Sequence, residues 1–281
     1  MRNLVIGLLF LAANAYAGAA PEKYYGHDFV NGISKGQLQG PALRTKLHEI
    51  LDSVHVPAAD GFDDIRPACT GGKCYQHQMV GYSAARKIIF GELFLTKQNG
   101  AYAVPDLYCE RLYGADDLGG HEPGPGITPD HRYVNVEHTW PQSEFSRRYV
   151  NELQKSDLHH LFPTDSEMNS RRSSYSFGKV DEEASRALKC ENSKLGESKG
   201  GETVFEPPTG HRGNVARAMF YFAVRYEMNI AKEEETTLRE WDRADPADDA
   251  ERARNEKIFG YQRDRNPFVD FPNLADKILD F

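Results

Sequence analysis

The sequence predicts a single α+β domain in which helices predominate. Three segments carry apolar residues at helical spacing, and shorter segments alternate apolar and polar residues as strands do. The 281 residues are 40% hydrophobic and 11% aromatic, so the chain has enough apolar side chains to bury a core. No Gly/Ser-rich or Pro-rich linker separates two halves of the sequence, and it contains no internal repeat.

The first half of the chain predicts two core-facing helices, an extended segment and a loop. Residues 41–55 and 83–95 place apolar side chains three and four positions apart, as one face of a helix does. Residues 101–113 alternate in polarity and are rich in aromatic side chains, which indicates an extended segment. The glycines and prolines between residues 119 and 126 then predict a loop.

The central segment predicts a strand, a loop, a second strand and a helix, in this order. Residues 132–138 alternate in polarity and end on a Glu-His pair, and residues 157–162 form the second, shorter strand. The following Pro-Thr-Asp sequence is a helix-start signal in which Asp165 is the candidate N-cap. Asn169 lies in the first turns of that helix, so it lies on an element that adjoins the Glu-His pair.

The last third of the chain is predicted to be mainly helical. Residues 214–228 form the clearest helix, with apolar side chains on one face and Arg217 and Arg225 on the other side or at the edges. Residues 232–256 contain ten acidic against five basic side chains, which predicts a solvated helical surface. Residues 263–272 are predicted to be a loop.

The N-terminus predicts a secretory signal peptide. Arg2 precedes an apolar run over residues 4–13, and Ala15-Tyr16-Ala17 has the small-x-small pattern of a cleavage site. The run is well short of the roughly 20 apolar residues of a membrane-spanning helix, and no second such run follows. We therefore expect residues 1–17 to be removed and residues 18–281 to be periplasmic or secreted, with no membrane association.

Four cysteines fit an oxidising compartment, where disulfides persist. Three connectivities are possible, and the simplest pairs Cys69 with Cys74 and Cys109 with Cys190. A zinc site is the weaker alternative, because the two outer cysteines lack the close partner spacing of zinc ribbons.

The formal net charge of −8 argues against a protein that coats nucleic acid without specificity. It does not exclude a nuclease, because a catalytic cleft needs only a local basic lining around the phosphate that is cleaved.

Glu137 and His138 are the strongest candidates for chemistry. An acidic side chain offers a hard oxygen to a metal ion, and its neighbour offers an imidazole that titrates near neutrality. Phosphodiester hydrolysis needs both, since a metal offsets phosphate charge and a base takes a proton from water. Taken alone, an adjacent Glu-His pair is more often structural. A second block, from Asp157 to Asn169 and Arg172, favours the catalytic interpretation.

Taken together, the motifs resemble the bacterial endonuclease I family of periplasmic and secreted nucleases. The matching blocks run in family order from about residue 82 to the C-terminus. They are Glu137-His138-Thr139-Trp140-Pro141, Ser156-Asp157-Leu158-His159-His160-Leu161, Met168-Asn169-Ser170-Arg171-Arg172, the block at residues 212–221 and the block at residues 265–270. The sequence departs from the family pattern at His160, where Asn is usual, and at Asn214, where Asp is common.

This resemblance implies a ββα-metal site. One Mg²⁺ would be held by Glu137 and Asn169, with water and substrate phosphate completing its shell, and His138 would be the general base. Mn²⁺ and Ca²⁺ remain open as alternatives. Arg172 matches the arginine after the family asparagine and is the first choice for a phosphate contact. The weaker candidates are Arg147, Arg148 and Arg171.

The other polar residues of these blocks have plainer interpretations. Asp157 and His159 are expected to make hydrogen bonds that either orient the site or stabilise the structure, rather than to be metal ligands. Trp140 is expected in the core. Arg212 and Arg217 either line a nucleic-acid groove or are solvated. Six further histidines lack ligand spacing and are expected to be structural or on the surface: His27, His48, His55, His77, His121 and His131.

The sequence therefore predicts a monomeric, metal-dependent endonuclease that acts on DNA, and on RNA as an open alternative. Contacts with phosphate rather than with base edges would make it tolerant of sequence. The family resemblance implies in-line attack that leaves 5′-phosphate and 3′-hydroxyl ends. A nucleic-acid-binding module that keeps the fold without activity is the second hypothesis. A metalloprotease is disfavoured, because the sequence contains no His-Glu-x-x-His pattern.

Overall fold

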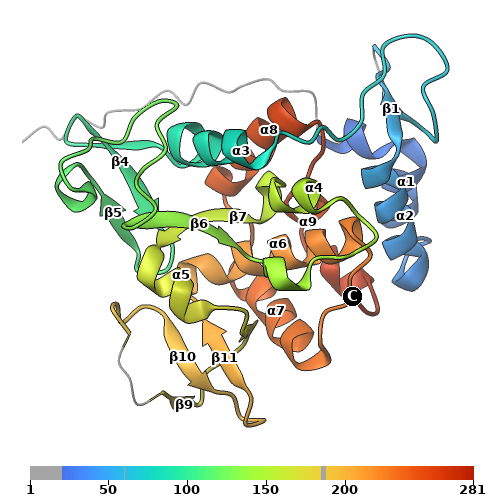
Figure 1. Cartoon of the computed structure of the whole chain (residues 1–281). Helices are drawn as coiled ribbons and strands as arrows, with labels where there is room; N and C mark the ends of the chain where they lie inside the picture. The colour runs from blue at the N-terminus through green and yellow to red at the C-terminus, as the bar shows by residue number, and fades with distance from the viewer. Residues whose placement is uncertain (1–20, 60, 185–187) are drawn as a thin grey trace, which may run out of the picture.

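A computed structural model describes residues 21–59, 61–184 and 188–281, so the predicted signal peptide at residues 1–17 lies outside the described residues. Helices and several small sheets alternate along the chain, which confirms the predicted α+β class (Figure 1). Over the described residues, no helix combines the length and apolar character needed to cross a membrane.

The N-terminal part consists of helices and one short strand pair. A 3-10 turn at Pro21–Tyr25 precedes α1 (His27–Ser34) and α2 (Gly40–Asp52), and β1 (Val54–Val56) pairs antiparallel with β2 (Asp64–Arg66). The apolar face of α2 is fully buried and contacts α6, so the helix predicted at residues 41–55 is confirmed. This packing covers one side of the core (Figure 1).

The next helix ends in an unusual turn. α3 (Tyr82–Ile88) continues into a π-helical turn at Ile89–Leu93, where a Cβ on Gly91 would lie 2.3 Å from the backbone nitrogen of Gly126. The glycine therefore lets the Gly/Pro-rich loop approach the helix. The extended segment predicted at residues 101–113 is a hairpin. The hairpin strands are β4 (Ala101–Asp106) and β5 (Arg111–Tyr113). β3 (Thr96–Gln98) pairs with β4, so the three strands form one antiparallel sheet.

The central unit consists of two antiparallel strands and a helix. β6 (Val134–His138) pairs with β7 (Leu161–Asp165), and α5 (Ser166–Arg172) follows directly. The Asp165 carboxylate accepts hydrogen bonds from the first backbone amides of α5, which confirms it as the N-cap. Between the strands lie a 3-10 turn (Gln142–Glu144), α4 (Asn151–Lys155) and a second 3-10 turn (Leu158–His160).

The second strand was predicted four residues too early. Residues 157–160 do not form a strand, because the Asp157 carboxylate accepts a hydrogen bond from the backbone amide of His159 and starts a 3-10 turn. The strand begins at Leu161 and includes Pro163, which was predicted to follow the strand as part of the helix-start signal. Proline is tolerated there because β7 belongs to a two-stranded sheet and need not donate on both sides.

A four-stranded sheet that the sequence did not predict follows α5. Its spatial order is β8-β11-β10-β9, with β8 and β11 parallel and the other pairs antiparallel. The strands have two to four residues each, too short for a periodicity signal. They are β8 (Ser176–Phe177), β9 (Glu182–Glu183), β10 (Lys194–Glu197) and β11 (Thr203–Glu206).

The C-terminal helices surround α6 (Arg212–Arg225), which contacts α2, α7 (Lys232–Ala244) and α9 (Pro267–Asp270). α6 is buried on nearly all sides, and Arg217 and Arg225 are buried with it, so neither of the two roles expected for Arg217, in a groove or in solvent, is present. Arg217 pairs with acidic residues of α7 and α8 (Asp249–Gln262), and Arg225 pairs with Asp52. The acidic stretch is thus partly buried, because its carboxylates neutralise arginines from other helices.

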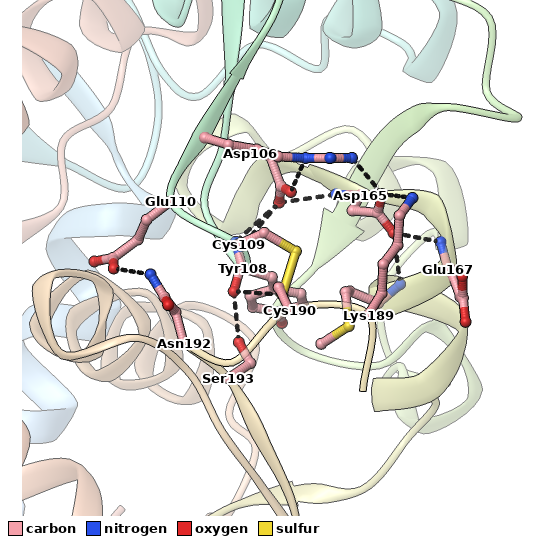
Figure 2. The surroundings of a disulfide bond; sticks show 12 residues. Asp106, Tyr108, Cys109, Glu110, Asp165, Glu167, Lys189, Cys190, Asn192 and Ser193 are labelled. Carbon is pink, nitrogen blue, oxygen red and sulfur yellow. Dashed lines mark hydrogen bonds and ion pairs between the residues drawn. A yellow bond between two sulfur atoms is a disulfide. The ribbon is translucent and has the colours of Figure 1, made fainter. Parts of the chain in front are cut away.

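Both expected disulfides are present, Cys69–Cys74 and Cys109–Cys190. The second joins the β4–β5 turn to the segment before β10 (Figure 2). Beside it, Ser193 donates a hydrogen bond of 2.7 Å to the carbonyl oxygen of Tyr108, and Lys189 pairs with Asp165. The disulfide therefore attaches the segment before β10 to the hairpin, and the Lys189–Asp165 ion pair attaches it to the start of α5.

We expect the two disulfides to contribute unequally to stability. Cys109–Cys190 closes a segment of 81 residues and Cys69–Cys74 one of 5. In the chain-entropy model their removal lowers the free energy of unfolding by about 4.5 and about 2 kcal/mol. Urea unfolding of the two double Cys→Ser variants measures the difference, and equal losses would contradict the expectation.

Candidate active site

One pocket of about 630 Å³ opens over the β6–β7–α5 unit and contains the three residues that carry the sequence motif. Glu137 and His138 stand at the end of β6, and Asn169 faces the same pocket from α5. Side chains of α3 complete the wall. The remaining lining consists mostly of polar residues from β6 itself and from the segments that flank β6 and α5: Asn135 of β6, and His131, Gln142, Ser143, Ser173 and Ser174 of the flanking segments.

Glu137 is buried, and one of its two carboxylate oxygens is held tightly. Oε1 accepts a hydrogen bond of 2.9 Å from the Tyr108 hydroxyl and lies 3.0 Å from Nη1 of Arg172. In the described part of the chain, Oε2 has no hydrogen-bond partner. Burial raises the pKa of Glu137, and the adjacent guanidinium opposes that shift. The orientation of the carboxylate is thus determined through one oxygen while the other stays free.

His138 is oriented by a hydrogen bond on each ring nitrogen. Nε2 lies 3.1 Å from the carbonyl oxygen of Lys155, and Nδ1 lies 3.2 Å from the side-chain amide nitrogen of Gln142. A carbonyl can only accept, so Nε2 carries the proton and Nδ1 carries the lone pair. Burial and the neighbouring His160 lower the pKa of His138 to about 3, so its imidazole is neutral at ordinary pH.

Asn169 is oriented by its neighbour on β6. Its Nδ2 donates a hydrogen bond of 2.7 Å to Oδ1 of Asn135, and both side chains line the pocket. Because the amide nitrogen is engaged, the Oδ1 atom of Asn169 is the group left available. Asn135 was not singled out from the sequence, although it lies two residues before Glu137 on the same strand and so on the same face of the strand.

Arg172 lies in the wall of the pocket and is almost fully buried, at 1% exposure. Besides pairing with Glu137, its guanidinium donates to the carbonyl oxygens of His138 (3.2 Å) and Thr139 (2.8 Å) and lies over the Phe177 ring. The other arginines suggested by the motif do not line the pocket, and one of them, Arg148, pairs with Glu227.

The structure adds an arginine to the pocket that the sequence analysis missed. Arg86 lines it from α3, four residues after Tyr82, which also lines it. The segment was interpreted as core-facing because of its apolar residues. The sequence signal for Arg86 was its place on the polar face of that helix, opposite the apolar face, where positions 82 and 86 lie one turn apart.

Asp157 and His159 do not line the pocket and belong to a separate buried hydrogen-bond network, so of their two expected roles the structure favours the structural one. Asp157, Asp264 and His77 have potential ligand atoms within 4.8 Å of one another, although His77 was expected to be unrelated to such a group. Every carboxylate oxygen of the two aspartates already accepts a hydrogen bond, from Tyr221, Tyr226, Gln262, His77 or a backbone amide. This network lacks the free oxygens that the pocket offers. Within the described residues, Glu137 and Asn169 each keep one side-chain oxygen without a hydrogen-bond partner.

The remaining expectations for single residues have clear outcomes. Trp140 is buried and stacks on Phe222, which confirms its place in the core. His160 rather than His159 lies beside His138, with ring centroids 5.4 Å apart. His55 is buried between two tyrosine rings, whereas His131 lies at the pocket.

Comparison with known proteins agrees with the motif order. The family model described as Endonuclease I matches residues 73–273. The chain belongs to the endonuclease I family. The matched range includes the Glu137-His138 pair and Asn169.

The similar proteins are nucleases by name. The chain is 35% identical over 164 residues to "Extracellular ribonuclease" of Bacillus subtilis (strain 168), covering 51% of this chain and 53% of the relative. It is 34% identical to "Periplasmic deoxyribonuclease" of Aeromonas hydrophila over 117 residues, which are 41% of this chain and 48% of that one. For "Endonuclease-1" of Buchnera aphidicola the identity is 30%, over 41% of this chain and 44% of the relative. The chain thus spans about half the length of the curated relatives it matches.

We expect the buried ion pair between Glu137 and Arg172 to be strongly coupled. Arg172→Met leaves a buried carboxylate without its counter-charge and should lower the free energy of unfolding by about 3–5 kcal/mol. Adding Glu137→Gln to that variant should restore part of the loss, because the unpaired charge disappears. Urea unfolding of the single and double variants gives the coupling, and strictly additive losses would contradict it.

Proposed function

We propose that this protein is an exported, metal-dependent endonuclease that hydrolyses phosphodiester bonds of DNA, and of RNA as a second substrate, with little sequence specificity. The observation that carries the proposal is the arrangement in the pocket. Two free oxygens, on Glu137 and Asn169, lie in the same pocket as a neutral imidazole whose Nδ1 lone pair accepts a hydrogen bond from the exposed Gln142 side chain, which an attacking water would replace. The names of the family relatives support the same class of reaction.

The ligand residues fit a divalent metal ion. Glu137 offers Oε2 and Asn169 offers Oδ1, and their other polar atoms are bound to Tyr108, Arg172 and Asn135. Two hard oxygens with room for water suit Mg²⁺, and Mn²⁺ and Ca²⁺ accept the same donors. When bound, the ion offsets negative charge on the phosphate and on the leaving oxygen. We assign β6, β7 and α5 as the two strands and the helix of a ββα-metal unit.

His138 acts as the general base in this proposal. Its Nδ1 takes a proton from the attacking water. Its Nε2–H keeps its hydrogen bond to the Lys155 carbonyl oxygen, which holds the ring in place. Attack in line with the 3′ oxygen breaks the bond from phosphorus to that oxygen. The 3′ oxygen leaves with the bonding electron pair and takes a proton from solvent water, so the products are a 5′-phosphate and a 3′-hydroxyl end.

Arg172 places a permanent positive charge at the scissile phosphate. Its guanidinium lies in the pocket wall, where Glu137 and two carbonyl oxygens hold it in position. Because these groups recognise phosphate rather than base edges, we propose that sequence has little influence on cleavage.

We also propose that residues 1–17 are a signal peptide and that residues 18–281 form one monomeric nuclease domain outside the cytoplasm. Two disulfides suit such a compartment, and relatives are named extracellular or periplasmic. The alternative is a nucleic-acid-binding module with the same fold and no catalysis.

Incubation of the purified protein with plasmid DNA and total RNA, with and without EDTA, tests this function. We expect degradation with Mg²⁺ and none with EDTA, because the reaction needs the ion. Binding without degradation in the presence of Mg²⁺, Mn²⁺ or Ca²⁺ would favour the binding module. Asn169→Ala should raise the Mg²⁺ concentration for half-maximal rate by roughly tenfold or more, whereas Ser170→Ala, which alters the neighbouring exposed residue, should not.

Replacement of His138 tests the base. His138→Ala should lower turnover by roughly 10²- to 10⁴-fold while Mg²⁺ binding and nucleic-acid binding persist, because only the proton acceptor is lost. His121→Ala changes an exposed histidine away from the pocket and serves as the control. Thermal unfolding checks that both variants fold. A His138→Ala enzyme with more than a tenth of wild-type turnover at saturating Mg²⁺ and substrate would show that another group is the base.

A further inference from the structure

Arg86 is the one permanently charged side chain of the pocket that has no counter-ion, counting the lining residues that the structure describes. Glu137 and Arg172 form an ion pair, so each has a counter-ion within the pocket. Arg86 is half-buried. Over residues 21–59, 61–184 and 188–281, no carboxylate lies within 4 Å of its guanidinium, and the guanidinium makes no hydrogen bond. The pocket thus presents an uncompensated positive charge.

The Arg86 guanidinium is anchored at a fixed distance along α3 from the residue that lies beside His138. Tyr82 and Arg86 are four residues apart on α3 and line the same pocket. The Tyr82 ring lies beside the His138 ring, with centroids 5.3 Å apart. A helix rises 1.5 Å per residue, so Arg86 is anchored about 6 Å further along α3 than the residue that touches the base.

The pocket has room for more than one phosphate. At about 630 Å³ it is within the range of pockets that enclose whole ligands rather than a single small group. The scissile phosphate must lie at Glu137, Asn169 and His138, where Arg172 already supplies positive charge. A guanidinium anchored a helical turn away is therefore available to the next phosphate of the same strand.

We propose that Arg86 binds the phosphate adjacent to the scissile one, so that the pocket recognises two consecutive phosphates of a nucleic-acid strand. The inference rests on the proposed nuclease function and adds a substrate subsite to it. The planar guanidinium can donate two parallel hydrogen bonds to phosphate oxygens, which suits this role better than a lysine would.

Dinucleotides with a single cleavable bond test this subsite. We compare kcat/KM for TpT with that for pTpT and TpTp, and use the UpU series in parallel. For wild type, the added terminal phosphate on one of the two sides should raise kcat/KM roughly 10- to 100-fold, the effect of a charge-assisted contact. In Arg86→Ala that gain should disappear, with a much smaller change on TpT itself. Arg86→Lys should keep part of it.

Lys87→Ala is the matched control, because Lys87 is an exposed cation on the same helix and does not line the pocket. It should keep the full gain, and thermal unfolding checks the fold of each variant. An equal gain in wild type and Arg86→Ala, or no gain in wild type on either side, would overturn the subsite. If wild type cleaved neither the dinucleotides nor long DNA and RNA, the proposed function itself would fail.

Discussion

The buried ion pair between Glu137 and Arg172 is the interaction on which the rest of the site depends. Removing two charges from water is unfavourable unless further hydrogen bonds complete their shells. Here Tyr108 donates to Glu137, and Arg172 donates to two carbonyl oxygens at the end of β6. The pair therefore joins the end of the strand to the end of α5. It also determines which carboxylate oxygen is left free to bind an ion.

A second set of contacts holds the elements that carry this pair. The buried Asp106 carboxylate accepts hydrogen bonds from the backbone amides of Tyr108, Cys109 and Asp165. Asp165 in turn caps α5, and Cys109 is covalently linked to Cys190 (Figure 2). The β4–β5 hairpin, β7 and α5 are thus connected through a few atoms. Tyr108, which orients Glu137, is part of the same connection, so the disulfide bears indirectly on the position of the Glu137 carboxylate.

The charge distribution explains how an acidic chain can recognise a polyanion. The net charge of −8 is that of the whole sequence. Many carboxylates pair with arginines of other segments, as Glu251 of α8 pairs with Arg217 of α6 and Asp270 of α9 pairs with Arg265 of the preceding loop. The pocket contains a single acidic side chain, already paired, and two arginines. Its local balance is therefore positive. That local balance determines phosphate binding, since screening in physiological salt limits the influence of distant charges.

The sequence by itself determined the features that depend on neighbouring residues. Helical spacing located α2, α3 and α6, alternation located β6, and a capping aspartate located the start of α5. The order of the motif residues indicated Glu137, His138 and Asn169. Tertiary structure alone decided the features that need distant segments: the four-stranded sheet after α5, the burial of Arg217, the partner of Arg172 and the place of Arg86 in the pocket. The physical reason is that periodicity and capping act within a few residues, whereas an ion pair or a short strand is stable only when the remainder of the fold brings its partner close.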